Sequence, residues 1–143
     1  MSLLEHIGWD LVRAARVWTS EFTDEVVAAG HPWFAEARGQ LVQHIGPNGV
    51  DQGALAERSG LTKQAVAQHL DVLEAEGLIV RENVASDSRR RRVVWTDLGR
   101  TALRDIDSAK SKVEARIRRR LGTARFKALR EGLQALAKTR QDA

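Results

Sequence analysis

Hydrophobic residues recur every three or four positions along the first 30 residues of the chain. The positions concerned are Leu4, Ile7, Leu11, Ala15, Trp18, Phe22 and Val26. An α-helix has about 3.6 residues per turn, so this spacing collects the apolar side chains on one face. The pattern predicts one long amphipathic helix that ends near Gly30.

The same period returns in the last third of the chain. One apolar run comprises Leu103, Ile106, Ala109, Val113, Ile117 and Leu121, and a second comprises Phe126, Leu129, Leu133 and Leu136. Gly122 and Thr123 separate the two runs, because glycine ends helices and threonine caps them. We therefore expect two further amphipathic helices, whose apolar faces a small central motif could hardly cover. A second copy of the chain would cover them, which predicts a homodimer.

Shorter elements are predicted between the long helices. Pro32 favours the first turn of a helix that runs to about Ile45, and the Gly-Pro-Asn-Gly sequence of residues 46–49 indicates a loop. Asp51 is a suitable cap for a short helix that extends to about Arg58.

A second short helix follows closely. Ser59-Gly60 supplies the tight turn of a helix-turn-helix, and Thr62 caps the next helix, which Gly77 ends. The apolar stripe of this helix consists of Val66, Leu70 and Leu73, so its other faces are free to contact a partner.

Residues 78–82 and 91–96 contain β-branched side chains around a polar, basic tip, which predicts a two-stranded wing. The predicted fold class is mainly α-helical with this small two-stranded β wing. A winged helix-turn-helix of about residues 32–97 would be flanked by long dimerisation helices of about residues 2–30 and 98–140. Residues 1–143 would form a single protomer.

The composition excludes several classes of chemistry. The chain of 143 residues contains no cysteine, so it has no disulfide, thiolate metal site or cysteine nucleophile. The four histidines lack metal-ligand spacing, and we find no phosphate-binding glycine motif or nucleophile elbow. We expect no cofactor, no metal and no enzymatic activity. The apolar runs are far shorter than the roughly 20 residues that span a bilayer, so we expect no membrane contact and a cytoplasmic location.

The formal net charge of +4 is distributed unevenly. Residues 1–60 contain four basic and eight acidic side chains, whereas residues 98–143 contain 13 basic and five acidic ones. A basic excess favours a polyanionic partner, but the two terminal segments could equally complement each other where they pack. We interpret Arg116 and Arg118 to Arg120 in this second way, as a solvated face or as partners of the acidic N-terminal helix.

Three segments carry a recognisable pattern. Residues 55–66 (LAERSGLTKQAV) and 73–81 (LEAEGLIVR) form the first, and Asp87-Ser88-Arg89 places an arginine two residues after an aspartate. Residues 94–100 (VWTDLGR) form the third, with Trp95 where leucine is usual. Together with the flanking helices, the pattern resembles the MarR family of transcriptional regulators. The resemblance implies that Arg89 enters the DNA minor groove and that Asp87 braces the wing through an ion pair.

The helix after Thr62 is the candidate reader of double-stranded DNA. Amide side chains pair with adenine edges, lysine pairs with guanine or phosphate, and alanine contacts the thymine methyl group. The candidate contact residues are Thr62, Lys63, Gln64, Ala67 and Gln68. The alternative interpretation is that these are simply solvated helix positions.

Four consecutive arginines, Arg89 to Arg92, place like charges on the predicted wing, and an external anion would relieve their repulsion. Because alternate residues of a strand face opposite ways, all four cannot enter one groove. The candidate DNA contacts of the wing are Arg89 and Arg90 at the tip, together with Arg91. The alternative is a plain solvated basic turn.

MarR-like regulators often bind small aromatic or phenolic ligands between the dimerisation helices and the DNA-binding lobe. His31, Trp33 and Phe34 are our candidates for such a pocket, and the alternative is core packing. The expected function is a ligand-responsive repressor that binds a pseudo-palindromic operator as a homodimer, with half-sites about one helical turn apart. The competing hypothesis is a helical protein-interaction module of winged-helix fold without specific DNA binding.

Overall fold

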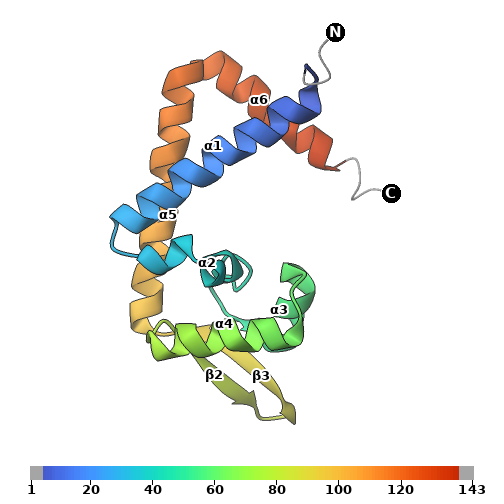
Figure 1. Cartoon of the computed structure of the whole chain (residues 1–143), viewed down its shortest axis with the longest axis vertical. Coiled ribbons are helices and arrows are strands. Elements are labelled where there is room, and N and C mark those ends of the chain that lie inside the picture. The colour runs from blue at the N-terminus through green and yellow to red at the C-terminus, as the bar shows by residue number, and fades with distance from the viewer. Residues whose placement is uncertain (1–4, 139–143) are drawn as a thin grey trace.

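The computed structural model describes residues 5–138, apart from the side chain of Ser88. In chain order the elements are α1 (Ile7–Ala28), the 3-10 helix η1 (Pro32–Ala35), α2 (Ala37–Val42), β1 (Val50–Asp51), α3 (Gln52–Ser59), α4 (Lys63–Ala75), β2 (Ile79–Val84), β3 (Asp87–Trp95), α5 (Asp97–Leu121) and α6 (Thr123–Lys138). Figure 1 shows two regions: the short helices and the strands gather at one end, and α1, α5 and α6 form an open frame at the other.

Helix α1 begins one residue after His6, whose Nδ1 accepts a hydrogen bond from the Trp9 backbone N–H (3.1 Å). Leu4, the first member of the predicted stripe, lies outside the described residues, as do the first residues of the predicted helix range. Only the C-terminal end of the stripe is buried, at Phe22 and Val26, whereas Ile7 is 75% exposed. No side chain in the N-terminal half of α1 is fully buried in the described structure.

The single helix predicted from Pro32 to about Ile45 is wrong. The chain forms η1 and α2 instead, separated by Glu36 in an extended conformation (φ −86°, ψ 168°). The two helices approach so closely that a Cβ atom at Gly39 would lie 2.1 Å from the Phe34 carbonyl oxygen. This close contact does not alter the spacing of hydrophobic residues along the chain. The spacing therefore could not predict that the helix is interrupted at Glu36.

The helix-turn-helix is confirmed with its predicted caps. Asp51 Oδ1 accepts a hydrogen bond from the Gly53 N–H (3.0 Å) at the start of α3. Gly60 then takes the left-handed conformation (φ 71°) that a tight turn needs and that glycine adopts without strain. Thr62 Oγ1 accepts from the Ala65 N–H (3.1 Å) and begins α4.

The sheet has three strands in the order β1-β3-β2, where the pattern predicted two. Strand β1 contains only two residues, Val50 and Asp51, which pair with Val93 and Arg92 of β3. A two-residue strand is too short to show an alternating pattern, so only its pairing with β3 identifies it as a strand.

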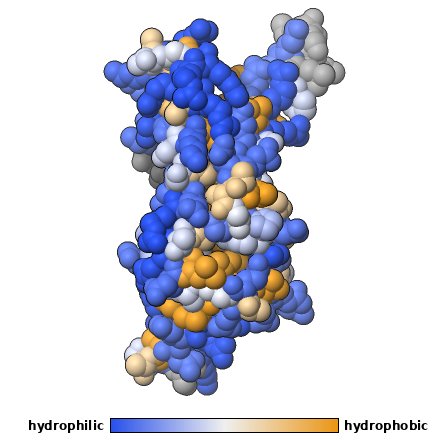
Figure 2. Space-filling model, turned by 90° about the vertical axis from the view of Figure 1, so that its left-hand side faces the viewer, coloured by the Kyte–Doolittle hydropathy of each residue, from blue (hydrophilic) through white to orange (hydrophobic). Residues whose placement is uncertain are grey.

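The hydrophobic core runs from the sheet into α1 and α5. Helix α5 contributes Ala102, Ile106, Ala109 and Val113, which are all buried. The predicted break at Gly122 is confirmed, but α6 has no buried residue, and Leu129, Leu133 and Leu136 are between 44% and 58% exposed. On the side of the molecule shown in Figure 2, the largest hydrophobic areas lie in the lower half, toward the wing.

Gly99→Ala should destabilise the fold, because an added Cβ atom would lie 2.0 Å from the Leu78 carbonyl oxygen and 2.7 Å from the Trp95 ring. We expect the free energy of unfolding to fall by about 1–3 kcal/mol, the usual cost of overpacking. Urea unfolding of both variants tests this, with Gly132→Ala as the matched helical control, since a Cβ at Gly132 meets nothing within 4 Å. Equal losses in the two variants would contradict the prediction.

Candidate nucleic-acid interface

Helix α4 is oriented by its buried face. Val66, Leu70 and Leu73 are each at most 1% exposed, so the opposite side of the helix faces solvent. Of the residues predicted to contact bases, four are exposed and Ala67 is half-buried; the exposed ones are Thr62, Lys63, Gln64 and Gln68. The arrangement fits a helix that presents polar donors and acceptors to a DNA groove.

The wing tip contains an irregularity in the pairing of β2 with β3. Asn83 pairs with Arg91, but the next pair is Val84 with Asp87, so residues 88–90 of β3 have no partner on β2. A bulge of this kind bends the strand and redirects its side chains. The strict alternation assumed from the sequence therefore does not apply to Arg89 and Arg90.

The arginines of the wing differ in their partners. The Arg90 Nε and Nη2 atoms lie 2.8 and 2.7 Å from Asp51 Oδ2. Arg92 Nη2 donates to the Asn48 carbonyl oxygen (2.6 Å). Within the described part of the chain, the Arg89 guanidinium has no hydrogen bond or ion pair and is exposed. Arg89 is therefore the tip arginine that is free to bind an external anion.

Asp87 supports the tip through the backbone. Its Oδ1 accepts a hydrogen bond from the Arg89 N–H (3.0 Å). The family resemblance implied an ion pair that braces the wing at this position, and this role of Asp87 stays a prediction. A separate ion pair connects Asp51 to Arg90.

A cleft of about 320 Å³ lies between the wing, the start of α3 and α4. Its lining residues are Asp51, Gln52, Gly53, Ala56, Lys63, Val66, Arg89, Arg90 and Arg91. The fold thus brings Lys63 of α4 together with three wing arginines. Such a concentration of positive charge attracts a polyanion backbone.

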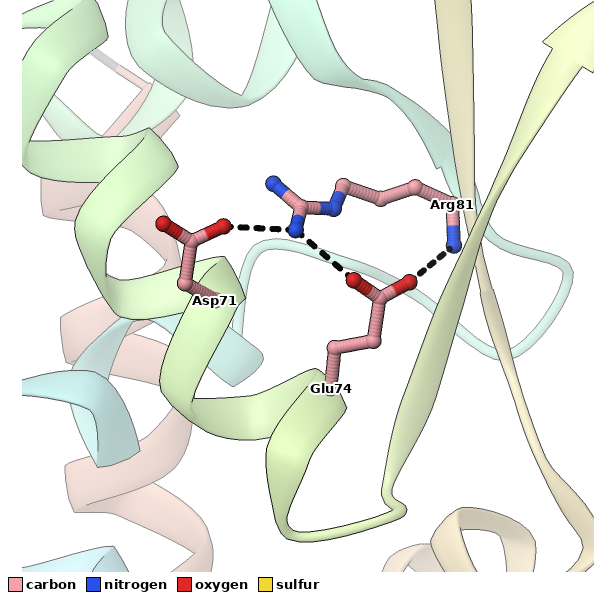
Figure 3. A network of polar contacts seen from close by, with 3 residues as sticks. All are labelled: Asp71, Glu74 and Arg81. Atoms are coloured by element: carbon pink, nitrogen blue, oxygen red, sulfur yellow. Dashed lines mark hydrogen bonds and ion pairs between the residues drawn. The ribbon is translucent and has the colours of Figure 1, made fainter.

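Arg81 joins the wing to α4 (Figure 3). Its Nη2 donates to Asp71 Oδ1 (2.6 Å) and to Glu74 Oε2 (2.7 Å), and its backbone N–H donates to Glu74 Oε1 (3.1 Å). The Arg81 side chain is only 12% exposed. The hydrogen bond from Arg81 holds the pKa of Glu74 below its ordinary value, and the same contact raises the pKa of Arg81.

These polar contacts are not predictable from the sequence. The sequence predicts Asp51 only as a helix cap, and it indicates no role for Asp71 or Glu74. Arg81 belongs to the segment that carries the family resemblance, which was the one available signal. The partners lie on different elements, so no local pattern connects them.

The basic cluster of α5, which comprises Arg116 and Arg118 to Arg120, makes contacts within the chain. Arg116 forms an ion pair with Glu25, and Arg120 forms one with Glu21 (2.5 Å). The Arg118 guanidinium lies over the Phe126 ring, 4.6 Å from its centroid. Arg116 and Arg120 thus pair with the acidic N-terminal helix, as one of the two interpretations predicted, whereas Arg118 contacts α6 and Arg119 is exposed.

Two of the three candidate ligand-pocket residues, Trp33 and Phe34, are packed in the core, and His31 is partly buried. Trp33 and Phe34 are 7% and 5% exposed, and their rings meet edge to face at 5.9 Å. His31 Nε2 lies 2.8 Å from Asp105 Oδ2, which links η1 to α5. In this conformation the two rings serve packing, and a ligand would have to displace side chains to reach them.

Residues 5–138 contain no group of three or more His, Cys, Asp or Glu side chains placed to hold a metal ion. No helix among them combines the length and the hydrophobicity that crossing a membrane requires.

A sequence model of the MarR family matches residues 37–90, from α2 to the wing tip. The winged-helix segment belongs to the MarR family. Among solved structures, the transcriptional repressor CouR bound to a 23-mer DNA duplex is 27% identical, with 94% of each chain covered and a TM-score of 0.74. CouR from Rhodococcus jostii RHA1 bound to p-coumaroyl-CoA is 24% identical over 96% of this chain and 95% of that one (TM-score 0.70). RV1404 from Mycobacterium tuberculosis is 20% identical over 97% and 95% (TM-score 0.77).

The Arg81 contact predicts an acid-dependent loss of stability for this MarR-family segment. The folded state holds the pKa of Glu74 below its ordinary value of 4.5. Ionised Glu74 therefore stabilises the fold above pH 4.5. This stabilisation is lost as the pH falls through the lower pKa of the folded state. Glu74→Gln should reduce stability at neutral pH by about 0.5–1 kcal/mol, since the pair is partly screened by solvent, and should flatten the acid limb.

Urea midpoints measured at neutral pH and about one unit below 4.5 test this prediction. Glu82→Gln is the control, because Glu82 is an exposed glutamate on the same strand. An acid limb that is unchanged in Glu74→Gln would show that the contact does not contribute to folding.

Proposed function

We propose that the chain is a sequence-specific DNA-binding transcriptional regulator that acts as a repressor. One observation carries the proposal: the cleft joins Lys63 of the recognition helix to the free Arg89 of the wing tip. Both groups belong to the segment that the MarR-family model matches. A helix and a basic wing on one surface suit the adjacent grooves of a DNA duplex.

In this proposal α4 lies in the major groove. Gln64 and Gln68 pair with base edges, and Lys63 contacts guanine or a phosphate. Arg89 enters the neighbouring minor groove or binds its phosphates, where a narrow groove concentrates negative potential. The complex of the repressor CouR with DNA, at 27% identity, supports this class of function.

We further propose that the regulator is a homodimer. The apolar side chains of α6 are exposed, and so is Ile7 in the N-terminal half of α1. In Figure 1 these helices form the open frame that projects from the winged-helix region. A second copy that covers them would give two recognition helices related by a two-fold axis. The operator would then be pseudo-palindromic, with half-sites about one helical turn apart.

A small aromatic ligand is proposed as the effector, supported by the complex of CouR with p-coumaroyl-CoA. Its site would involve His31, Trp33 and Phe34, where η1 meets α5 through the contact of His31 with Asp105. Because Trp33 and Phe34 are buried, the effector would favour a conformation in which η1 has moved. Release from DNA then follows from the difference in effector affinity between the two conformations.

The test of this function is binding of the purified protein to a duplex from the region upstream of its own gene, compared with a shuffled duplex at two salt concentrations. We expect tight, salt-sensitive binding that prefers the native duplex. Absence of salt-sensitive binding to either duplex would favour the alternative of a winged-helix protein-interaction module.

Arg89→Gln should weaken DNA binding by about 5- to 100-fold, the equivalent of roughly 1–3 kcal/mol, because it removes the free guanidinium at the wing tip. Arg119→Gln is the matched control, since Arg119 is an exposed arginine on α5 and its loss changes the net charge equally. Fluorescence anisotropy titrations of both variants provide the measurement. Similar losses in the two variants would refute the role of the wing.

Leu133→Glu should dissociate the dimer, because it places a charge on the exposed apolar face of α6. Gln134→Glu introduces the same side chain at the next, polar position of the same helix and should leave the dimer intact. Sedimentation velocity reports the assembly state. A Leu133→Glu protein that sediments as the wild type does would place the interface elsewhere.

A further inference from the structure

Asp51 lies where three elements of the winged helix meet. Its backbone pairs with Arg92 in the sheet, and its Oδ1 caps α3 through the Gly53 N–H (3.0 Å). Its Oδ2 receives both the Nε and the Nη2 of Arg90, at 2.8 and 2.7 Å. The two carboxylate oxygens thus hold two different elements at once.

We propose that Asp51 is a positioning residue for DNA binding, which clamps the wing tip against α3 through Arg90. In this arrangement Arg90 is part of the clamp, and Arg89 is the tip arginine that contacts DNA. The inference rests on the proposed function, and it reassigns Arg90 from the set of predicted DNA contacts.

The wing tip needs such a clamp because its backbone is weakly held. Beyond the pair of Asn83 with Arg91, only Val84 and Asp87 pair across the hairpin, and residues 88–90 are bulged. The Asp51 contact fastens the bulge at Arg90, directly beside Arg89. The direction in which Arg89 projects therefore depends on a residue of another element.

Stability of the fold does not explain the contact. The Arg90 side chain is 56% exposed, and ion pairs in such positions contribute little to folding. Their geometric effect on a short hairpin is separate, because fixing one side chain of the bulge restricts the whole tip. Asp51 stays ionised at neutral pH, since the hydrogen bond from Arg90 lowers its pKa.

The clamp also neutralises the negative charge of the Asp51 carboxylate through Arg90. The Asp51 carboxylate lines the cleft that contains Lys63 and Arg89, so without Arg90 it would repel an approaching phosphate. The opposite hypothesis is that Arg90 leaves Asp51 to bind phosphate. Asp51 would then compete with DNA, and its neutralisation would strengthen binding. The two hypotheses predict changes of opposite sign.

Asp51→Asn separates them, because asparagine caps helices as well as aspartate does but cannot form the ion pair. The proteins to compare are the wild type, Asp51→Asn, Arg90→Gln and the double variant, titrated with the upstream duplex over a range of salt. The clamp predicts that Asp51→Asn weakens binding by about two- to five-fold although a negative charge is removed. It also predicts that the double variant binds no more weakly than the weaker single variant.

The salt dependence distinguishes a clamp from a phosphate contact in Arg90→Gln. A clamp leaves the slope of log affinity against log salt unchanged, whereas loss of a phosphate contact lowers its magnitude by about one. Asp51→Asn binding that equals or exceeds that of the wild type, or a lowered slope in Arg90→Gln, would overturn the inference.

Hydrogen exchange of the free protein tests the clamp without DNA. The backbone N–H groups of residues 85–91 should exchange several-fold faster in Asp51→Asn, and those of α4 should not change. Unchanged exchange at the tip would overturn the clamp. If the wild type binds no DNA while tip exchange still accelerates, the clamp stands and the proposed function fails.

Discussion

The winged helix depends on the position of β3 as the middle strand of the sheet. Val93 is fully buried, and it pairs with Val50 on one side and with Arg81 on the other. The same strand carries the wing arginines at one end and delivers the chain to the Thr96 cap of α5 at the other. Burial of apolar residues along β3 thus fixes the wing relative to α3 and to the long helix α5.

Polar contacts convert this scaffold into a cationic surface. Residues 61–97 contain six basic and six acidic side chains and have no net charge. Asp71 and Glu74 bind Arg81, and Glu76 binds Arg38 of α2. Because these acids contact partners outside the cleft, its charged lining consists of Lys63, the three wing arginines and one acid, Asp51, which is paired with Arg90. The positive charge of the cleft thus results from where the charged side chains lie in the fold, and the zero net charge of residues 61–97 does not reveal it.

In the long helices, charged side chains are paired whereas many apolar side chains are exposed. The acidic end of α1 and the basic end of α5 neutralise each other through Glu21, Glu25, Arg116 and Arg120. The apolar stripe of α1 is buried at Phe22 and Val26, and Trp18 is partly buried against the same core, whereas α6 has no buried side chain. The long helices therefore pair these four charges internally but leave apolar side chains of α6 and Ile7 of α1 exposed to solvent.

The sequence by itself determined whatever depends on neighbouring residues. The stripes of α4 and α5, the caps at Asp51 and Thr62, and the turns at Gly60 and Gly122 are local, because a helix and its ends are defined within a few residues. Tertiary structure alone decided the division of η1 from α2, the two-residue strand β1, the bulge at the wing tip and the partners of Arg81 and Arg90. The strand β1 and the Asp51 contact of Arg90 join segments about 40 residues apart, whereas the other features depend on how neighbouring elements pack in the folded chain. Side chains that meet only in the folded chain leave no periodic signal.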